Sequence, residues 1–268
     1  MGTDSAHSQA PVRLIVSAYV LEMARRLAFF ARRFGHNADA ARAESLAVSM
    51  LAALRAEFRR PGGSWAGGEP TSLGAALYFG LCEGPDEAAA TARLLAETVR
   101  ARGHQAHFGI FGAKWVPRVL ADHGYVDDAF RLFVQPDYPG WGNWVKRGAT
   151  ALWESWEGGD SLNHIMFGDL SAWAFEFLGG IRPGMEHPGF ARIELRPCFP
   201  KELDRFEARH TTPRGEIAVS WERKGGRIVY RASLPCGVRA DLRLPGLPVR
   251  RGVTGTLEET LDTSVLRS

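Results

Sequence analysis

Residues 169–183 are Asp-Leu-Ser-Ala-Trp-Ala-Phe-Glu-Phe-Leu-Gly-Gly-Ile-Arg-Pro, and the expected architecture changes within this stretch. Its apolar residues from Leu170 to Leu178 recur at three- and four-residue steps, which is the spacing of one helix face. The pair Gly179-Gly180 is expected to end that helix. Four prolines follow by residue 200, and they prevent a helix from continuing. The sequence therefore predicts helices before this point and a different structure after it.

Upstream, the same spacing predicts six further helices. A long apolar stripe marks the first helix, at residues 16–34, and Gly35 ends it. The second extends over about residues 39–58. Four shorter helices are expected around the segments 71–81, 85–101, 111–123 and 127–134. Seven helices joined by short links indicate helical hairpins.

Downstream of residue 190 the apolar period becomes two, which is typical of half-buried strands. The alternation covers residues 193–195, 217–221, 228–234 and 238–244, with a hairpin turn at Gly225-Gly226. Residues 250–268 show no clear pattern. The predicted fold is therefore α+β, with a helical domain at residues 1–180 and a C-terminal antiparallel β-sandwich at residues 181–268.

Composition narrows the functional classes. The 268 residues include 33 basic and 30 acidic side chains that are spread along the chain, so no charged tail for nucleic acid is expected. The arginine-rich run at residues 25–33 is expected to be a solvated helix face. Three cysteines without CxxC spacing, Cys82, Cys198 and Cys236, argue against disulfides and a zinc site. The polar N-terminus and the lack of a long apolar run predict a cytoplasmic protein that spans no membrane.

The densest run of unusual residues lies between residues 137 and 164, where four of the eight tryptophans fall within sixteen residues. Tryptophan faces stack well on the C–H faces of sugar rings, so Trp141, Trp153 and Trp156 are candidate sugar-binding residues. Ordinary core packing is the alternative reading of these side chains. Trp144 belongs to the same run, and core packing is the favoured interpretation of Trp141 and Trp144 taken alone.

Glu154 is the candidate catalytic carboxylate of this run. Flanked by Trp153 and Trp156, it is expected to lose solvation, which favours its neutral form and suits an acid or a base. Glycoside hydrolysis needs two carboxylates, roughly 6.5–9.5 Å apart when water attacks the sugar directly. A structural pairing of Glu154 with Arg147 is the alternative. His164 is close enough in sequence to bind a sugar hydroxyl or orient a carboxylate, although a structural histidine is the more common case.

Five motifs in this order resemble glycoside hydrolase family 78, the bacterial α-L-rhamnosidases. They are His107-Phe-Gly-Ile-Phe-Gly-Ala-Lys114, Asp137-Tyr-Pro-Gly-Trp-Gly142, Gly148-Ala-Thr-Ala-Leu-Trp-Glu154, Ser161-Leu-Asn-His-Ile-Met-Phe-Gly168 and Pro188-Gly-Phe190. The resemblance extends from about residue 11 to residue 244. It implies the later helices of an (α/α)6 six-hairpin barrel followed by a β-sandwich.

The resemblance also implies roles for the candidate residues. Glu154 matches the general base that activates water in an inverting mechanism, and His164 matches the histidine that contacts rhamnose. Trp141 and Trp153 match aromatic residues that line the sugar pocket. The implied substrate is a rhamnose-containing glycoside or oligosaccharide, and the implied chemistry uses no metal and no organic cofactor.

One part of the family pattern is missing. The family's general acid lies in an Arg-Asp-Glu motif followed by Gly-Trp, and the sequence has no match to it. Seven helices are also fewer than the twelve of an (α/α)6 barrel. The chain is therefore expected to be a fragment, or a truncated member that needs a partner for its N-terminal half, with exposed apolar helix faces. A catalytically inactive carbohydrate-binding or interaction module and a nonfunctional remnant are the alternatives.

Overall fold

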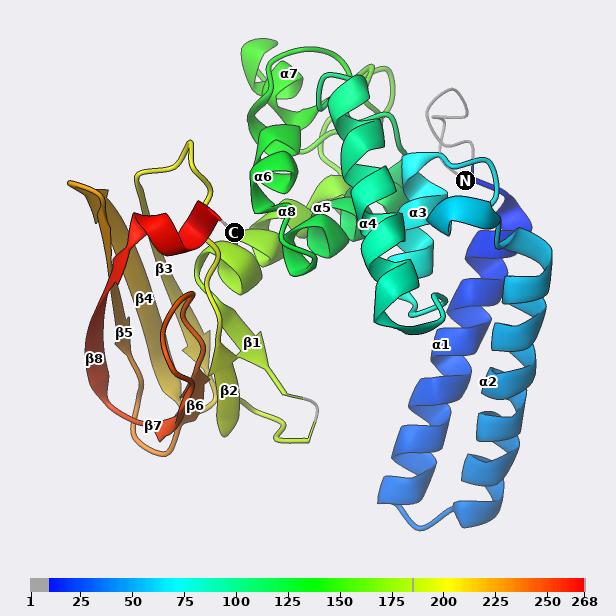
Figure 1. The fold of residues 1–268 in the computed structure, drawn as a ribbon, viewed down its shortest axis with the longest axis horizontal. Coiled ribbons are helices and arrows are strands. Elements are labelled where there is room, and N and C mark those ends of the chain that lie inside the picture. The colour runs from blue at the N-terminus through cyan, green and yellow to red at the C-terminus, as the bar shows by residue number, and fades with distance from the viewer. Residues whose placement is uncertain (1–9, 185, 268) are drawn as a thin grey trace. The chain divides into compact units, whose positions relative to one another are not determined.

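The computed structural model describes residues 10–184 and 186–267, which form two compact units, Met1–Gly168 and Asp169–Ser268 (Figure 1). Residues 1–9, on which the prediction of no export leader rests, lie outside the described residues. The helix predicted at residues 169–178 belongs to the second unit. Within residues 10–184 and 186–267, no helix is both long enough and apolar enough to cross a membrane.

The first unit is helical. Its elements are α1 (Val12–Arg33), α2 (Asn37–Phe58), the 3₁₀ turn η1 (Pro61–Gly63), α3 (Pro70–Tyr78), α4 (Gly84–Ala101), α5 (Ile110–Asp122), α6 (Val126–Val134), α7 (Trp141–Lys146) and the 3₁₀ turn η2 (Ile165–Phe167). The six helices predicted before residue 135 are all confirmed. The short helix α7 was not expected, because its glycine and its two tryptophans give no apolar stripe of helical spacing.

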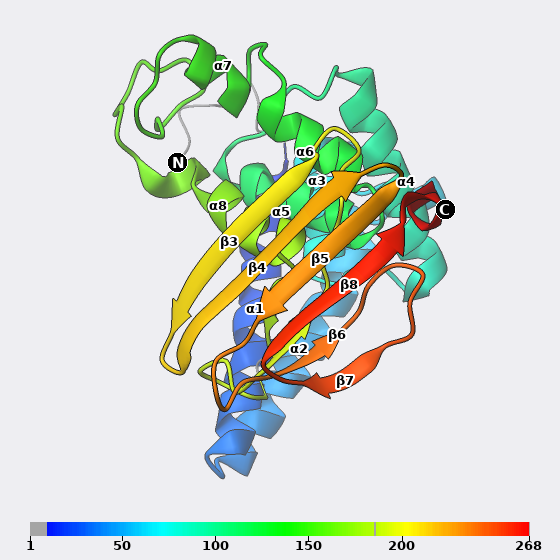
Figure 2. The same cartoon turned by 90° about the vertical axis from the view of Figure 1, so that its left-hand side faces the viewer.

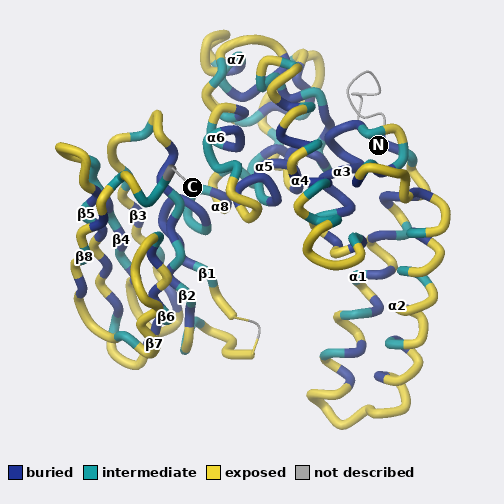
Figure 3. The backbone as a smooth tube through the Cα atoms, viewed as in Figure 1, coloured by how far each residue is buried: buried dark blue, intermediate teal, exposed yellow. Residues whose placement is uncertain are grey.

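Helices α1 and α2 lie side by side as a hairpin (Figure 1). The buried residues of α1 are mainly alanines and leucines: Leu14, Ile15, Ala18, Leu21, Ala24, Ala28 and Ala31. The apolar stripe at residues 16–34 lies on the other side and is exposed, as in Met23 (67%) and Phe34 (71%) (Figure 3). Small residues allow two helices to approach closely, so they form the hairpin contact. The expected exposed apolar helix face is therefore present in this chain.

The second unit is a β-sandwich that follows a short helix, α8 (Asp169–Trp173), and one π-helical turn, η3 (Ala174–Leu178). One sheet has the order β1-β2-β6-β7, and the other has the order β3-β4-β5-β8, which Figure 2 shows. The strands are β1 (Ile181–Pro183), β2 (Arg192–Leu195), β3 (Arg205–Thr212), β4 (Gly215–Lys224), β5 (Arg227–Ser233), β6 (Arg239–Leu242), β7 (Arg250–Val253) and β8 (Thr256–Asp262).

Both sheets contribute side chains to a single core, which includes Ile193, Trp221 and Tyr230. The Nε1 of Trp221 donates to the Leu178 carbonyl oxygen (2.9 Å), and the Tyr230 hydroxyl donates to the Gly179 carbonyl oxygen (3.1 Å). These bonds satisfy carbonyls at the end of the last helix, where the backbone would otherwise lack partners. Burial raises the pKa of Tyr230.

The strand predictions were correct in kind but incomplete. The turn at Gly225-Gly226 is confirmed, because it joins the antiparallel strands β4 and β5. The prediction of only antiparallel strands was wrong at one place, where β2 pairs with β6 in parallel. Residues 250–268 are not patternless either, because β7 and β8 form there and β8 pairs with β5 along its whole length.

Candidate active site

The candidate site lies in the irregular segment that follows α7, and two backbone hydrogen bonds fold this segment back on itself. The Glu154 amide donates to the Ser161 carbonyl oxygen (2.9 Å), and the His164 amide donates to the Leu152 carbonyl oxygen (2.7 Å). Glu154 and His164 are ten positions apart in sequence, and these two backbone hydrogen bonds bring them side by side. The local backbone therefore sets the positions of both candidate residues.

Gly158 makes this return of the chain possible. Its φ angle is +73°, a left-handed conformation that favours glycine. A Cβ atom at this position would lie 2.6 Å from the ring of Trp153, so a side chain would also collide with the indole. Both the turn and the close ring contact therefore require glycine here.

The side chains of Glu154 and His164 face one another. Glu154 Oε1 lies 4.0 Å from His164 Nε2, and Glu154 Oε2 accepts a hydrogen bond from the Ser161 amide (3.3 Å). His164 Nδ1 accepts a hydrogen bond from the Met166 amide (3.3 Å), so the proton of the neutral ring is on Nε2. The site thus presents a carboxylate and a ring N–H donor at the same place.

Both side chains remain open to solvent, with exposed fractions of 39% for Glu154 and 32% for His164. Glu154 is therefore less covered than expected among the described residues, because the flanking indoles of Trp153 and Trp156 are themselves buried. Such exposure leaves room for a water molecule and a sugar to reach the carboxylate.

The alternative pairing of Glu154 with Arg147 is not formed among the described residues. The Arg147 guanidinium lies over the Trp153 ring, 4.7 Å from its centroid. Cation–π contact of this kind holds the arginine and covers one face of the indole. Glu154 is consequently free of a cationic arginine partner within the described part of the chain.

Trp156 lies at the centre of an aromatic cluster beneath this segment. It is fully buried, and its ring centroid is 4.3 Å from that of Phe167, 4.8 Å from Trp144 and 4.9 Å from Trp141. Its Nε1 donates to the Phe108 carbonyl oxygen (2.8 Å). A ring without exposed surface has no face to offer a sugar, so this geometry favours the packing alternative for Trp156.

Trp141 and Trp153 are also largely buried, at 5% and 8% exposure. Trp141 Nε1 donates to the Phe167 carbonyl oxygen (3.1 Å), which ties α7 to the η2 turn. Their remaining exposed edges are small, and the sugar-contact role stays a prediction for both.

Sequence reasoning did not find the contribution of Met166. Its backbone amide fixes the His164 tautomer, and a backbone contact of this kind cannot be predicted from the type of residue.

Comparisons with known proteins identify the family to which this chain belongs. Residues 2–178 match the model of the bacterial α-L-rhamnosidase six-hairpin glycosidase domain. The chain belongs to this family. Residues 180–257 match the model of the bacterial α-L-rhamnosidase C-terminal domain, which corresponds to the β-sandwich.

The curated relatives that match this chain are much longer than it is. The α-L-rhamnosidase of Streptomyces avermitilis is 27% identical over 88% of this chain, but that match covers 24% of the relative. A Formosa agariphila α-L-rhamnosidase is 29% identical over 90% of this chain and 27% of the relative. The chain therefore spans about a quarter of the length of these curated relatives.

Solved structures support the fold. The crystal structure of native α-L-rhamnosidase from Aspergillus terreus superimposes with a TM-score of 0.88 at 23% identity, covering 96% of this chain and 31% of that chain. The Streptomyces avermitilis enzyme complexed with L-rhamnose gives a TM-score of 0.87 at 23% identity, over 97% and 28% of the two chains. The predicted partial six-hairpin barrel followed by a β-sandwich is confirmed.

Proposed function

We propose that this chain supplies the general base of an inverting α-L-rhamnosidase, and that Glu154 is this base. The observation that carries the proposal is the pairing of an open Glu154 carboxylate with the His164 N–H, 4.0 Å apart, in a segment held by two backbone hydrogen bonds. Membership of the rhamnosidase family supports L-rhamnose as the sugar. The substrate is then a glycoside or oligosaccharide with terminal rhamnose.

The proposed reaction is a single displacement at the anomeric carbon. A water molecule bound to Glu154 transfers a proton to the carboxylate while its oxygen bonds to the anomeric carbon. The bond from that carbon to the glycosidic oxygen breaks on the opposite face, so the configuration inverts. The departing oxygen takes a proton from a general acid, which the motifs of this chain do not supply.

His164 is proposed to bind a rhamnose hydroxyl through its Nε2–H. We expect His164→Ala to raise KM for an aryl α-L-rhamnoside by about fivefold and to change kcat less, because a hydrogen bond of this type contributes about 1 kcal/mol. Steady-state kinetics would show the split, and His164→Gln, which keeps an N–H donor, should recover part of the loss. A fall in kcat with KM unchanged would refute a pure binding role.

We further propose that the exposed face of α1 is covered by other helices of the six-hairpin domain, carried outside residues 1–268. Two observations support this occupant. The face is apolar along the whole helix, and the relatives hold about three quarters of their length outside the matched region. An apolar patch of this extent marks an interface.

The uncovered α1 face should make the isolated chain self-associate. We expect Leu27→Glu to shift the chain towards monomer in size-exclusion chromatography with light scattering, because a charge at the centre of the patch opposes apolar contact. Val249→Glu is the matched control, since Val249 is also exposed but lies in the β-sandwich unit. A monomeric parent chain, or an equal effect of both substitutions, would contradict the proposed interface.

A catalytically inactive carbohydrate-binding module is the second candidate, and the missing general-acid motif favours it. Cleavage of an aryl α-L-rhamnoside tests both functions, because an aryl group leaves as a phenolate and needs little help from an acid. Rhamnose binding without any turnover that depends on Glu154 would favour the module.

We also propose a reducing cytoplasmic compartment, which the three free cysteines support.

A further inference from the structure

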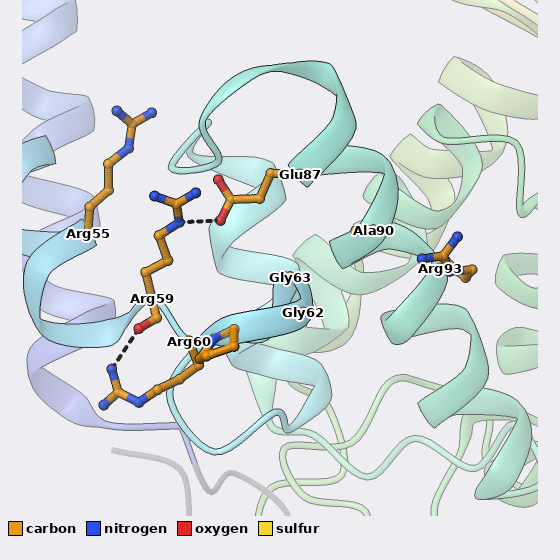
Figure 4. A pocket seen from close by; sticks show the side chains of 9 residues that line it. Arg55, Arg59, Arg60, Gly62, Gly63, Glu87, Ala90 and Arg93 are labelled. Carbon is orange, nitrogen blue, oxygen red and sulfur yellow. Dashed lines mark hydrogen bonds and ion pairs between the residues drawn. The ribbon is translucent and has the colours of Figure 1, made fainter.

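A cavity of about 620 Å³ lies between the C-terminal end of α2, the η1 turn and α4. Its charged lining consists of four arginines, Arg55, Arg59, Arg60 and Arg93, and one carboxylate, Glu87 (Figure 4). We propose that this arginine pocket binds an oxyanion group, namely the phosphate, sulfate or carboxylate of a small ligand. This inference goes beyond the rhamnosidase function and does not depend on it.

Three of the four guanidinium groups carry charge that no carboxylate neutralises in the described structure. Arg55 donates only to the carbonyl oxygens of Leu81 (2.6 Å) and Cys82 (2.9 Å). Arg60 donates to two carbonyl oxygens of its own turn. Arg93 has no hydrogen bond or ion pair to any described residue. Carbonyl contacts orient a guanidinium but leave its positive charge in place, so the pocket retains a net attraction for anions.

The fourth arginine is fixed by acidic residues. Arg59 Nε donates to Glu87 (2.7 Å), as Figure 4 shows, and its Nη1 donates to Glu83 (2.8 Å), which leaves Nη2 without a carboxylate partner among the described residues. The lining has four positive charges and one negative charge, a net charge of +3, and Glu83 outside the lining reduces it to +2. The guanidinium groups of Arg55 and Arg59 are therefore held in place, and such fixed donors suit oxyanions, whose paired oxygens match the guanidinium fork.

The base of the pocket is made of small residues. Gly62 and Gly63 both have left-handed backbone, with φ angles of +71° and +77°. A Cβ on Gly63 would lie 2.9 Å from the Thr91 backbone nitrogen, so the turn packs directly against α4. Figure 4 shows Arg55 and Arg59 on one side of this turn and Arg93 on the other. The volume is within the range of small-molecule sites and accommodates a sugar or a phosphate.

Two surface arginines elsewhere in this unit are paired with carboxylates instead. Arg32 is paired with Glu44 (2.6 Å), and Arg26 is paired with Glu22 (2.8 Å). The arginine-rich run at residues 25–33, expected to be a solvated face, therefore has its charge partly balanced. No lining residue of the arginine pocket comes from residues 137–168, so the pocket is separate from the candidate active site.

Isothermal titration of the full chain, at constant ionic strength, tests the proposal with four probes: inorganic phosphate, inorganic sulfate, glucuronate and glucose. We expect at least one of the three oxyanions to bind in the millimolar range and neutral glucose not to bind. Arg93→Gln and Arg60→Gln should each weaken that binding about tenfold, since a charged hydrogen bond contributes about 1.5–3 kcal/mol. Both side chains are exposed, so the fold should tolerate the changes.

Arg42→Gln is the matched control, because Arg42 is an exposed arginine of α2 outside the pocket. Binding of phosphate or sulfate without glucuronate would assign the pocket to phosphate or sulfate esters, and binding of glucuronate would assign it to acidic saccharides. Either result supports an oxyanion site. Binding that is equal for glucose, that is unaffected by the two pocket substitutions, or that is absent for all three anions would overturn the proposal.

Discussion

Glu154→Gln is expected to reduce the rate of aryl α-L-rhamnoside cleavage by about 10²–10⁴-fold, the usual contribution of a general base. Glutamine has nearly the same shape as glutamate and can still accept the Ser161 amide hydrogen bond, so the local structure should persist. It cannot take a proton from water. The loss should therefore appear in kcat and not in KM.

A neighbouring carboxylate provides the control for this prediction. Asp160 is exposed in the same segment, and Asp160→Asn should leave the aryl rhamnoside rate nearly unchanged, because an aryl leaving group needs little acid catalysis. Rates measured with a chromogenic substrate would separate the two variants. If Glu154→Gln and the parent chain cleave the substrate equally fast, the assignment of the base is wrong.

Trp156→Ala is expected to lower the free energy of unfolding of the helical unit by about 3–5 kcal/mol, the range measured for removal of a large buried aromatic side chain. Its ring fills the space between Trp141, Trp144 and Phe167, and its Nε1 satisfies the Phe108 carbonyl. The substitution would leave both a cavity and an unpaired acceptor. The segment that carries Glu154 rests on this cluster, so activity should fall as well.

Urea unfolding followed by tryptophan fluorescence and circular dichroism would measure this loss. Trp156→Phe is the matched variant, because it keeps much of the ring packing and removes only the N–H donor. Its free energy of unfolding should fall by the packing lost between indole and phenyl rings, plus about 1 kcal/mol for the missing hydrogen bond. An unfolding midpoint of Trp156→Ala close to that of the parent chain would show that the aromatic cluster does not support the site.

The helices could be predicted because their apolar spacing is a local property of the chain. The side of α1 that forms the hairpin contact could not, because it depends on which neighbour is present. Large residues such as Met23 and Phe34 form the apolar stripe, yet they are exposed, and the buried face of α1 is rich in alanine. We proposed that helices outside residues 1–268 cover this stripe, and a sequence pattern does not say which partner covers it.

The strands missed by sequence reasoning have weak apolar alternation. Strand β8 has only two buried residues, Leu257 and Leu261, with two glutamates and one threonine between them. Its place in the sheet comes from pairing with β5, which is a long-range contact. The parallel pairing of β2 with β6 joins segments more than forty residues apart, and neither segment contains a sequence pattern that predicts it.

The sequence singled out Glu154 and His164 through their motifs, and the structure places their side chains 4.0 Å apart. The burial of the tryptophans could not be decided in advance, because sugar stacking and core packing use the same residue type. For Trp156 the surroundings favour core packing, because three aromatic rings occupy the space around it. The exposure of Glu154 was also unexpected, because neighbours in sequence do not always cover one another in space.

Azide rescue of Glu154→Ala tests the central claim most directly. Azide is an anionic nucleophile that needs no base, and removal of the carboxylate makes room for it beside the anomeric carbon. With an aryl α-L-rhamnoside as substrate, we predict that Glu154→Ala is nearly inactive in buffer, and that azide restores cleavage and yields β-L-rhamnosyl azide, the inverted product. Cleavage by Glu154→Ala that azide does not accelerate, or an azide product of retained configuration, would contradict the role of Glu154 as the base of an inverting reaction.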